Sequence, residues 1–152
     1  MKHFITSLFA CILALQAYCL THIYSGNSHY SSDIIATWDG RYLYSGAYTY
    51  SSNIAITFDG RYLYKGSSTY SSNIIATWDG RYMYSGRSTY SSDIAAGCDR
   101  KYVYCGRSTY SSDIVATIYN NRVYRGRSTY SLNIEFCYDG PLPIAIIVFL
   151  CL

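Results

Sequence analysis

The sequence predicts an all-β fold, a closed or nearly closed ring or barrel of repeated β-hairpins of about 20 residues each. Three observations support this prediction. The chain repeats with a twenty-residue period, an Asp-Gly pair separates two β-prone runs in most repeats, and the array begins and ends on half a unit. Such a period means that one small unit is copied and packs against its neighbours in a shared core. The period is marked by Gly26, Gly46, Gly66, Gly86, Gly106 and Gly126.

Each complete repeat is expected to form one hairpin. In the first, two runs rich in β-branched and aromatic residues, 34–38 and 41–44, flank Asp39-Gly40. This pair is a strong hairpin signal because a type I′ turn needs positive φ at both central residues. A two-residue turn at this pair would place Trp38 opposite Arg41.

Side-chain alternation along these strands assigns one face of each hairpin to the core. On that face the columns of Ile34, Ala36, Trp38 and Leu43 are apolar in all five complete repeats. The opposite face is half polar, and we expect its tyrosines to be exposed enough to stack on sugars, or else to serve as cross-strand packing. This possible aromatic surface comprises Tyr42, Tyr44, Tyr62, Tyr64, Tyr82 and Tyr84.

Two turns and the linking segments depart from a plain hairpin pattern. Arg100 replaces the turn glycine in the fourth repeat and predicts a strained or different turn. In the fifth repeat a turn at Asn120-Asn121 would pair Ile118 with Val123 and keep both on the core face. The links consist mainly of glycine and small hydroxyl residues with a recurring tyrosine, such as Tyr70, which we expect to pack inward against the neighbouring unit.

The ends of the array predict closure. Residues 21–25 match the second strand of a repeat and residues 134–138 match the first. Five full hairpins therefore lie between split terminal strands, which would pair and remove exposed sheet edges. The sequence leaves five-fold and six-fold closure open.

The repeats resemble those of the β-flower proteins, in which short β-hairpin petals repeat around a pseudo-symmetry axis. The resemblance rests on units such as GSSTYSSNIIATWDGRYMYS and covers about residues 20–140. It implies the fold of the hairpin-repeat domain. Because the family has no established activity, it implies no function.

The two ends of the chain do not repeat. Residues 1–19 are expected to be a signal peptide, with a short polar start, an apolar run and a small-residue pattern that favours cleavage after Cys19 or after Ala17. The repeat domain is expected to span 20–140. Residues 141–152 form an apolar C-terminal tail, which would be a final strand or plug covering the ring, a membrane-touching segment, or a divergent terminus.

Charge is distributed unevenly along the repeats. The formal net charge of +3 is too small to indicate nucleic acid. The later repeats nevertheless carry most of the basic residues, and Arg87, Arg107 and Arg127 share one repeat column. These three residues are either a solvated face or a possible anionic-ligand surface for lipid or polysaccharide.

Cysteine usage agrees only weakly with export. Cys98, Cys105, Cys137 and Cys151 remain after signal removal and permit three disulfide pairings, which the sequence leaves open. Cys98 stands in an apolar column that holds tryptophan in two other repeats, as a small buried hydrophobe would. No cysteine spacing indicates a metal site.

No residues suggest catalysis or cofactor binding. The repeated serines and aspartates are spaced by whole units, and His22 and His29 have no recognisable partner motif. We therefore expect no catalytic, cofactor-binding or metal-binding residues. The expected function is that of an exported structural or protein-interaction module; the alternative is a ligand-binding module. The partners considered are a cell-surface protein, a glycan or an anionic lipid.

Overall fold

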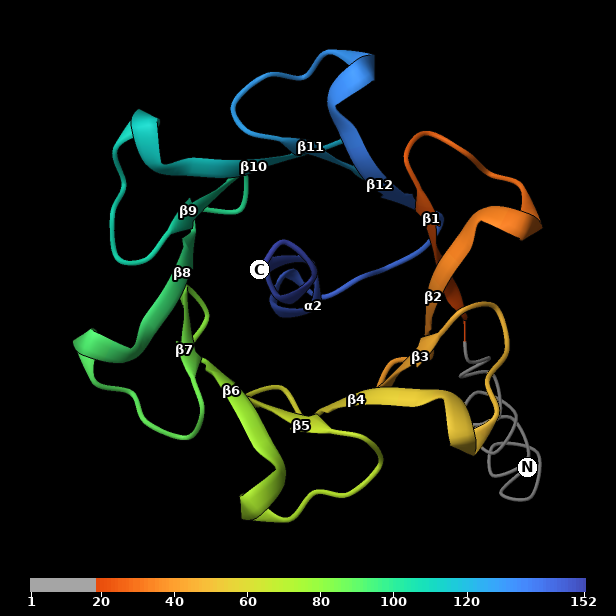
Figure 1. Ribbon diagram of the computed structural model, residues 1–152, viewed down its shortest axis with the longest axis horizontal. Helices are drawn as coiled ribbons and strands as arrows, with labels where there is room; N and C mark the ends of the chain where they lie inside the picture. Colours follow the sequence, from red (N-terminus) through yellow and green to blue (C-terminus); the bar gives the residue numbers. More distant parts are fainter. Residues whose placement is uncertain (1–18) are drawn as a thin grey trace, which may run out of the picture.

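The computed structural model describes residues 19–152, which form a closed antiparallel barrel of twelve strands (Figure 1). Apart from Cys19, the predicted signal peptide lies outside the described residues. The strands are β1 (Thr21–Ser25), β2 (Ile34–Trp38), β3 (Tyr42–Ser45), β4 (Ile54–Phe58), β5 (Tyr62–Lys65), β6 (Ile74–Trp78), β7 (Tyr82–Ser85), β8 (Ile94–Cys98), β9 (Tyr102–Cys105), β10 (Ile114–Tyr119), β11 (Arg122–Arg125) and β12 (Ile134–Tyr138). The single described α-helix is α2 (Ile144–Leu150).

The barrel consists of six petals. Five are the consecutive hairpins β2–β3, β4–β5, β6–β7, β8–β9 and β10–β11, and the sixth joins the two ends of the chain. In this sixth petal β12 and β1 pair antiparallel, with Ile23 opposite Tyr138 and Tyr24 opposite Cys137. The predicted closed ring of five hairpins plus split terminal strands is confirmed, and its closure is six-fold.

The hairpin turns differ from the predicted register by two residues. Trp38 pairs with Leu43, not with Arg41. The Asp39 carboxylate causes the shift, because its Oδ1 accepts the backbone N–H groups of Arg41 and Tyr42 at 2.8 and 2.7 Å. An even shift leaves every side chain on its predicted face.

The two unusual turns also form hairpins. Arg100 keeps the turn of the other repeats and adopts a φ of 79°, a left-handed conformation that strains a residue with a Cβ. In the fifth petal, Asn120 and Asn121 have φ values of 49° and 57°, as a type I′ turn requires. Ile118 pairs with Val123 there, as predicted.

A β-bulge changes one predicted core position. Ile23 pairs with Ala36 but Tyr24 pairs with Ile34, so Ile35 is an extra residue on β2. The same irregularity recurs in the equivalent strand of the other petals. The prediction that the Ile34 column lies in the core is wrong. Residues of the next column along the strand pack against the core instead. These are Ala55, Ile75 and Val115.

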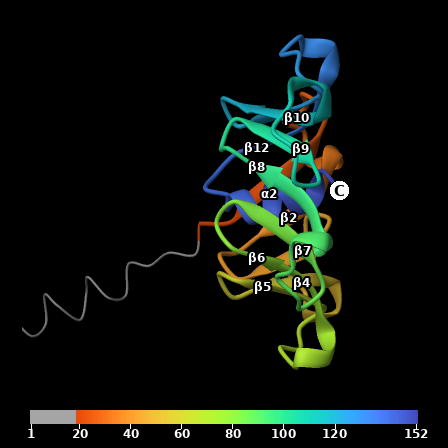
Figure 2. The ribbon, with the colours of Figure 1, turned by 90° about the vertical axis from the view of Figure 1, so that its left-hand side faces the viewer.

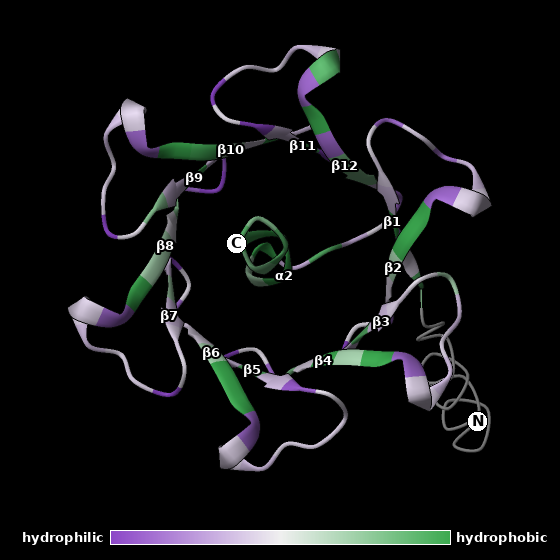
Figure 3. Cartoon of the chain, viewed as in Figure 1, coloured by the Kyte–Doolittle hydropathy of each residue, from purple (hydrophilic) through white to green (hydrophobic). Residues whose placement is uncertain are grey.

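Helix α2 fills the centre of the barrel (Figure 1). Its residues 145–148 are buried among strand residues such as Leu63, Met83 and Val103, each of which has no exposed surface. Figure 3 shows this helix as an apolar element surrounded by the ring. Of the three predicted alternatives for the tail, the plug is the one observed, as a helix inside the ring. Over residues 19–152, no helix has both the length and the apolar character needed to cross a membrane.

The ring has two distinct regions outside its core. Viewed edge-on, the hairpin turns lie on one side and the wider linking loops spread at the perimeter (Figure 2). We call the side that carries the turns of residues 39–42 and their equivalents the turn face. The linking segments 26–33, 46–53, 66–73, 86–93, 106–113 and 126–133 are called the petal loops; each ends in a short 3₁₀ turn such as Ser51–Asn53.

Candidate functional site

Each petal loop is held at its base by a backbone hydrogen bond from its first glycine to the preceding hairpin. In the first petal the Thr37 hydroxyl donates to the carbonyl oxygen of Gly46 at 2.8 Å. The same bond recurs with Thr57, Thr77 and Thr117 as donors. These threonines have no exposed surface, so the bond fixes the base of the loop in a dry environment.

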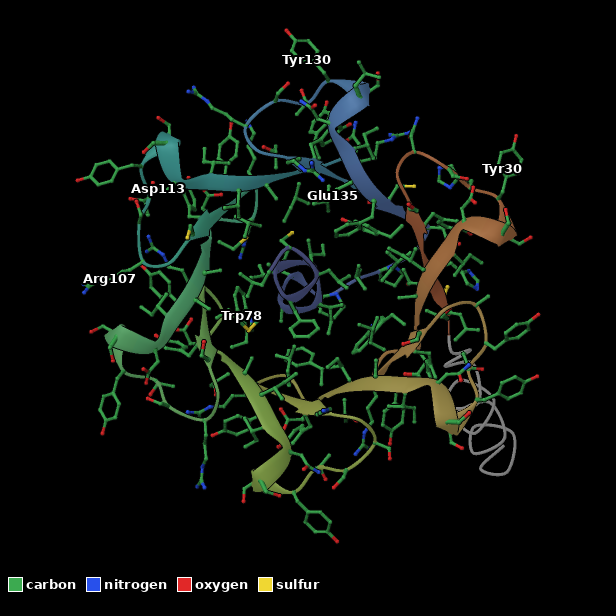
Figure 4. All side chains as sticks on the ribbon, in the orientation of Figure 1. Tyr30, Trp78, Arg107, Asp113, Tyr130 and Glu135 are labelled. Atoms are coloured by element: carbon green, nitrogen blue, oxygen red, sulfur yellow. The ribbon has the colours of Figure 1, made fainter. Side chains whose placement is uncertain are left out.

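The petal tips present a ring of exposed tyrosines. Their side chains are between 65 and 78% exposed, and Tyr30 and Tyr130 point away from the barrel (Figure 4). The expectation that this column packs inward is wrong, because the petal loops spread at the perimeter of the ring and leave these side chains exposed. In the petal loop 46–53 Tyr48 stacks on Tyr50, with ring centroids 5.7 Å apart. The six are Tyr30, Tyr50, Tyr70, Tyr90, Tyr110 and Tyr130.

The predicted aromatic surface is largely closed to ligands. Tyr44 is buried and its hydroxyl donates to Asp39 Oδ2 at 2.8 Å. Burial and this bond raise the pKa of Tyr44 to about 12. Tyr64 and Tyr84 are buried in the same way. Of the two alternatives for this column, burial against the strands is the one observed, because an aspartate five residues earlier anchors each hydroxyl.

The second predicted column is half-buried and already has a partner. The Arg41 guanidinium lies 5.4 Å from the centroid of the Tyr42 ring. The rings of Tyr62 and Tyr82 are covered by Arg61 and Arg81 at similar distances. These tyrosines therefore serve first as platforms for turn-face cations.

The predicted basic residues lie on three successive petal loops. Arg87, Arg107 and Arg127 are all exposed, and Figure 4 shows Arg107 at the perimeter. None of the three forms an ion pair within the described part of the chain. Arg107 lies close enough to Tyr84, on the preceding petal, for its charge to act against the rise in the pKa of that hydroxyl, which the bond to Asp79 and burial cause.

The turn face contains two aromatic grooves that the sequence reasoning did not identify. The first, of about 560 Å³, lies between the turns of the first two petals and is lined by Trp38, Arg41, Phe58 and Pro143. The second, of about 470 Å³, lies between the turns of the second and third petals and is lined by Arg61, Trp78, Asp79 and Thr89. The alternation that placed these aromatic residues on the core face gave no sign that they stand at the rim of the barrel.

The sixth petal differs chemically from the others. His22 Nδ1 lies 3.1 Å from Asp139 Oδ2, which also accepts the Tyr24 hydroxyl at 2.9 Å. Cys137 takes the threonine position, donates to the Ser28 carbonyl, and has its sulfur 3.9 Å from His29 Nε2. These contacts join the two chain ends across the closing seam.

The sixth petal nevertheless offers no reactive thiol. Cys137 is buried, and burial raises the pKa of its thiol. A buried thiol with a raised pKa is a poor nucleophile and a poor metal ligand, because both roles need the thiolate.

Within residues 19–152 the cysteines are all free, so none of the pairings that the sequence permits is made there. No group of three or more His, Cys, Asp or Glu side chains in that part of the chain is placed to hold a metal ion.

Comparison with known proteins agrees with this geometry. A family model described as a 6-fold beta flower protein matches residues 23–147, from the first strand to the middle of α2. No curated protein matches the chain, and no solved structure does. The match covers most of the 152 residues, and six petals around one axis are what its description states. The chain belongs to the 6-fold β-flower family.

Proposed function

We propose that this protein is an exported, non-catalytic module that binds partner proteins through its petal loops. The observation that carries the proposal is the ring of six petal-tip tyrosines, each between 65 and 78% exposed. A large aromatic side chain exposed once is ordinary, but six at equivalent positions of one ring form a repeated contact surface.

The composition of the petal loops supports recognition of protein surfaces. Each loop combines one or two tyrosines with glycine, serine and asparagine or aspartate, and every loop except 26–33 also contains threonine. Tyrosine offers a large, rigid, amphipathic contact at low entropic cost, while serine and asparagine adapt their hydrogen bonds to the partner. Loops of this composition bind proteins in antibody paratopes by the same physics.

The six-fold arrangement supports multivalent binding. A partner that carries several copies of the recognised feature would engage several petals at once, so that weak single contacts add up to tight binding. The aspartates of the turns are already occupied by backbone N–H groups and tyrosine hydroxyls, which leaves them unsuited to acid–base chemistry. Export rests on the predicted signal peptide of residues 1–19.

The test compares the wild-type protein with a variant in which all six petal-tip tyrosines are serine. Tyr119→Ser serves as a control because Tyr119 is also exposed but lies at a hairpin turn. Extracellular proteins captured by the wild type are purified, and their direct binding to each variant is measured by interferometry. The proposal expects binding by the wild type and by Y119S and its loss in the six-site variant, with unchanged thermal unfolding in all three.

Two results would overturn the proposal. One is a purified partner that binds the six-site variant as tightly as the wild type. The other is a wild type that captures no protein but binds glycans or anionic liposomes, which would favour a ligand-binding module instead. Binding that also disappears on charge reversal at Arg87, Arg107 and Arg127 would identify that surface as the anionic-ligand site.

A further inference from the structure

We propose that the turn face of the first three petals binds an acidic oligosaccharide, with sugar rings against Phe58 and Trp78 and carboxylates on Arg41 and Arg61. The second groove includes Thr89, the neighbour of Tyr90 in the petal loop 86–93, but the proposed contacts use none of the petal-tip tyrosines and do not depend on the proposed function above. Four observations support it, concerning the aromatic rims, the free cations, the polar groups and the asymmetry of the ring.

The grooves have aromatic surface that a ligand can reach. Phe58 and Trp78 occupy the last position of β4 and β6 and are only partly buried, although both pack against the core. Trp38, which is itself buried, packs beside Phe58 with its ring centroid 6.5 Å from that of Phe58. Figure 4 shows Trp78 directed toward the inside of the ring. Flat apolar rings at a groove rim stack on the C–H faces of sugar rings, as they do on other flat ligands.

Each groove places a cation beside its aromatic ring. The Phe58 N–H donates to the Arg41 carbonyl oxygen at 2.9 Å, and the Trp78 N–H donates to the Arg61 carbonyl oxygen at 2.7 Å. These backbone bonds fix one arginine next to one aromatic residue in two successive petals. A ligand that contacts the ring therefore lies within reach of the guanidinium.

The two guanidinium groups have no acidic partner in the described part of the chain. Asp59, the nearest candidate in the first groove, accepts the N–H groups of Arg61 and Tyr62 through Oδ1 and the Tyr64 hydroxyl through Oδ2. Asp59 keeps its negative charge, but its oxygens are held by these donors and it forms no ion pair with Arg41 or Arg61. Because the planar guanidinium pairs with carboxylates in a bidentate fashion, the ligand that suits this surface is a uronate-containing sugar.

The ring is asymmetric in a way that suits a single elongated ligand. The residues equivalent to Phe58 and Trp78 in the fourth and fifth petals are Cys98 and Ile118, which provide no aromatic surface. Arg81 and Lys101 remain beside them, through the same backbone bonds. The two aromatic grooves are therefore adjacent, and the chain itself provides cation positions without aromatic neighbours as internal controls.

The experiment uses tryptophan fluorescence, since Trp38 and Trp78 are the only two tryptophans of the chain and both line the grooves. The purified protein is titrated with tetragalacturonate, with a neutral galacto-tetrasaccharide, with a sulfated heparin tetrasaccharide and with polyphosphate. The uronate tetrasaccharide is expected to change the fluorescence and to bind most tightly. A sulfated ligand that binds more tightly than the uronate would overturn the assignment of the anionic group.

Variants separate stacking from charge. Arg61→Gln and Trp78→Ile, measured by calorimetry, are each expected to weaken uronate binding about tenfold, the size of one good contact. Trp78→Phe introduces the residue that the second petal has at this position, Phe58, and is expected to retain most of the affinity. This variant keeps the test valid if W78I folds poorly. Arg81→Gln is the matched control and is expected to leave the affinity unchanged.

Three outcomes would overturn the proposal. The first is no fluorescence change and no heat at millimolar tetragalacturonate. The second is equal affinity for the neutral tetrasaccharide, because the arginines would then have no role. The third is equal affinity for polyphosphate together with full binding by W78F and W78I, because charge alone would then explain the interaction.

Discussion

The hydroxyl of Tyr64 donates a hydrogen bond to Asp59 at 2.8 Å, while the other carboxylate oxygen of Asp59 accepts the N–H groups of Arg61 and Tyr62. One carboxylate thus fixes both the turn and the tyrosine that covers the strand. The same arrangement occurs at Asp39, Asp79 and Asp99, and a variant of it, with His22, occurs at Asp139. The stability of the ring therefore depends on five carboxylates.

Stability should fall at both extremes of pH. Burial acts to raise the pKa of Asp59, but the donated N–H and O–H groups outweigh it and hold that pKa below its ordinary value of 3.8. This contribution is present above pH 3.8 and is lost as the pH falls through the lower folded value. For Tyr44 the pKa rises from 10.0 to about 12, so its contribution to stability is lost as the pH rises through that range.

Urea unfolding at a series of pH values measures the loss of stability at acid and at alkaline pH. Asp59→Asn should flatten the acid limb of this profile, and Tyr44→Phe should flatten the alkaline limb. Unaltered slopes in both variants would show that the carboxylates do not control stability.

Gly97→Thr should stabilise the fourth petal by about 1–2 kcal/mol, because it adds a hydrogen bond and removes a glycine from a strand. Gly97 occupies the threonine column, and the carbonyl of Gly106 lies 3.4 Å from the position of its missing Cβ. The new Cβ would stand 3.1 Å from Tyr82 Cε1, so the ring must move slightly. Tyr42 and Tyr62 already pair with threonines at this position. Thermal unfolding measures the effect, and Thr77→Gly is the reverse control. A lower melting temperature for G97T would mean that Tyr82 cannot move.

Arg100→Gly should stabilise the protein by about 1 kcal/mol, because a side-chain-bearing residue at a φ of 79° is strained there. The glycines at the equivalent turn positions of the first three petals have φ values between 99 and 101°. Denaturant unfolding checks the change, with Gly80→Arg expected to lose a similar amount. Equal stability of R100G and the wild type would show that the fourth turn bears no strain.

Ile146→Ala should destabilise the fold by about 2–5 kcal/mol, the range for a fully buried aliphatic residue truncated in a core. Ile146 lies in α2 with no exposed surface. Leu152→Ala, at the exposed chain end, should change stability by less than about 0.5 kcal/mol. Urea unfolding of both variants tests whether α2 is part of the core. A cost for I146A no larger than that for L152A would rule this out.

Charge reversal of Arg87, Arg107 and Arg127 to glutamate should abolish any binding to anionic liposomes or polyanions that weakens with salt. All three side chains are exposed on neighbouring petal loops, so the variant should unfold at the same temperature as the wild type. Co-sedimentation with liposomes at low and physiological salt is the measurement. Unchanged binding by the triple variant would exclude these residues as an anionic-ligand surface.

The sequence predicted the fold well because the repeat supplies the same information five times. Side-chain alternation along the strands placed Leu43 and Ala36 in the core, and the half-units at the ends indicated closure. The register was wrong because a side chain, Asp39, takes over the hydrogen bonds of the turn, which strand pattern alone does not reveal. The bulge at Ile35 was missed for a similar reason, since both of its neighbours are apolar.

The candidate sites were harder to predict than the fold. Whether a tyrosine is buried depends on the strand or loop around it. Tyr50 is exposed although we expected it to pack inward, and Tyr44 is buried although it could have been exposed. The spacing of five residues between Asp39 and Tyr44, which most repeats keep, was the available signal for the burial of Tyr44. The grooves at Phe58 and Trp78 depend on where the barrel rim lies, which no local pattern specifies.

The strand that closes the barrel and the helix that fills it both lie at the C-terminal end of the chain. The seam joins residues 115 positions apart, Tyr24 and Asp139, and α2 follows only after that seam. Open repeat arrays can fold unit by unit from either end, because each unit is complete once its neighbour is present. In this ring an incomplete chain has two unpaired edges and an empty interior, so folding should be slow and all-or-none. A chain that stops before β12 would therefore be an aggregation-prone fragment rather than a smaller closed barrel.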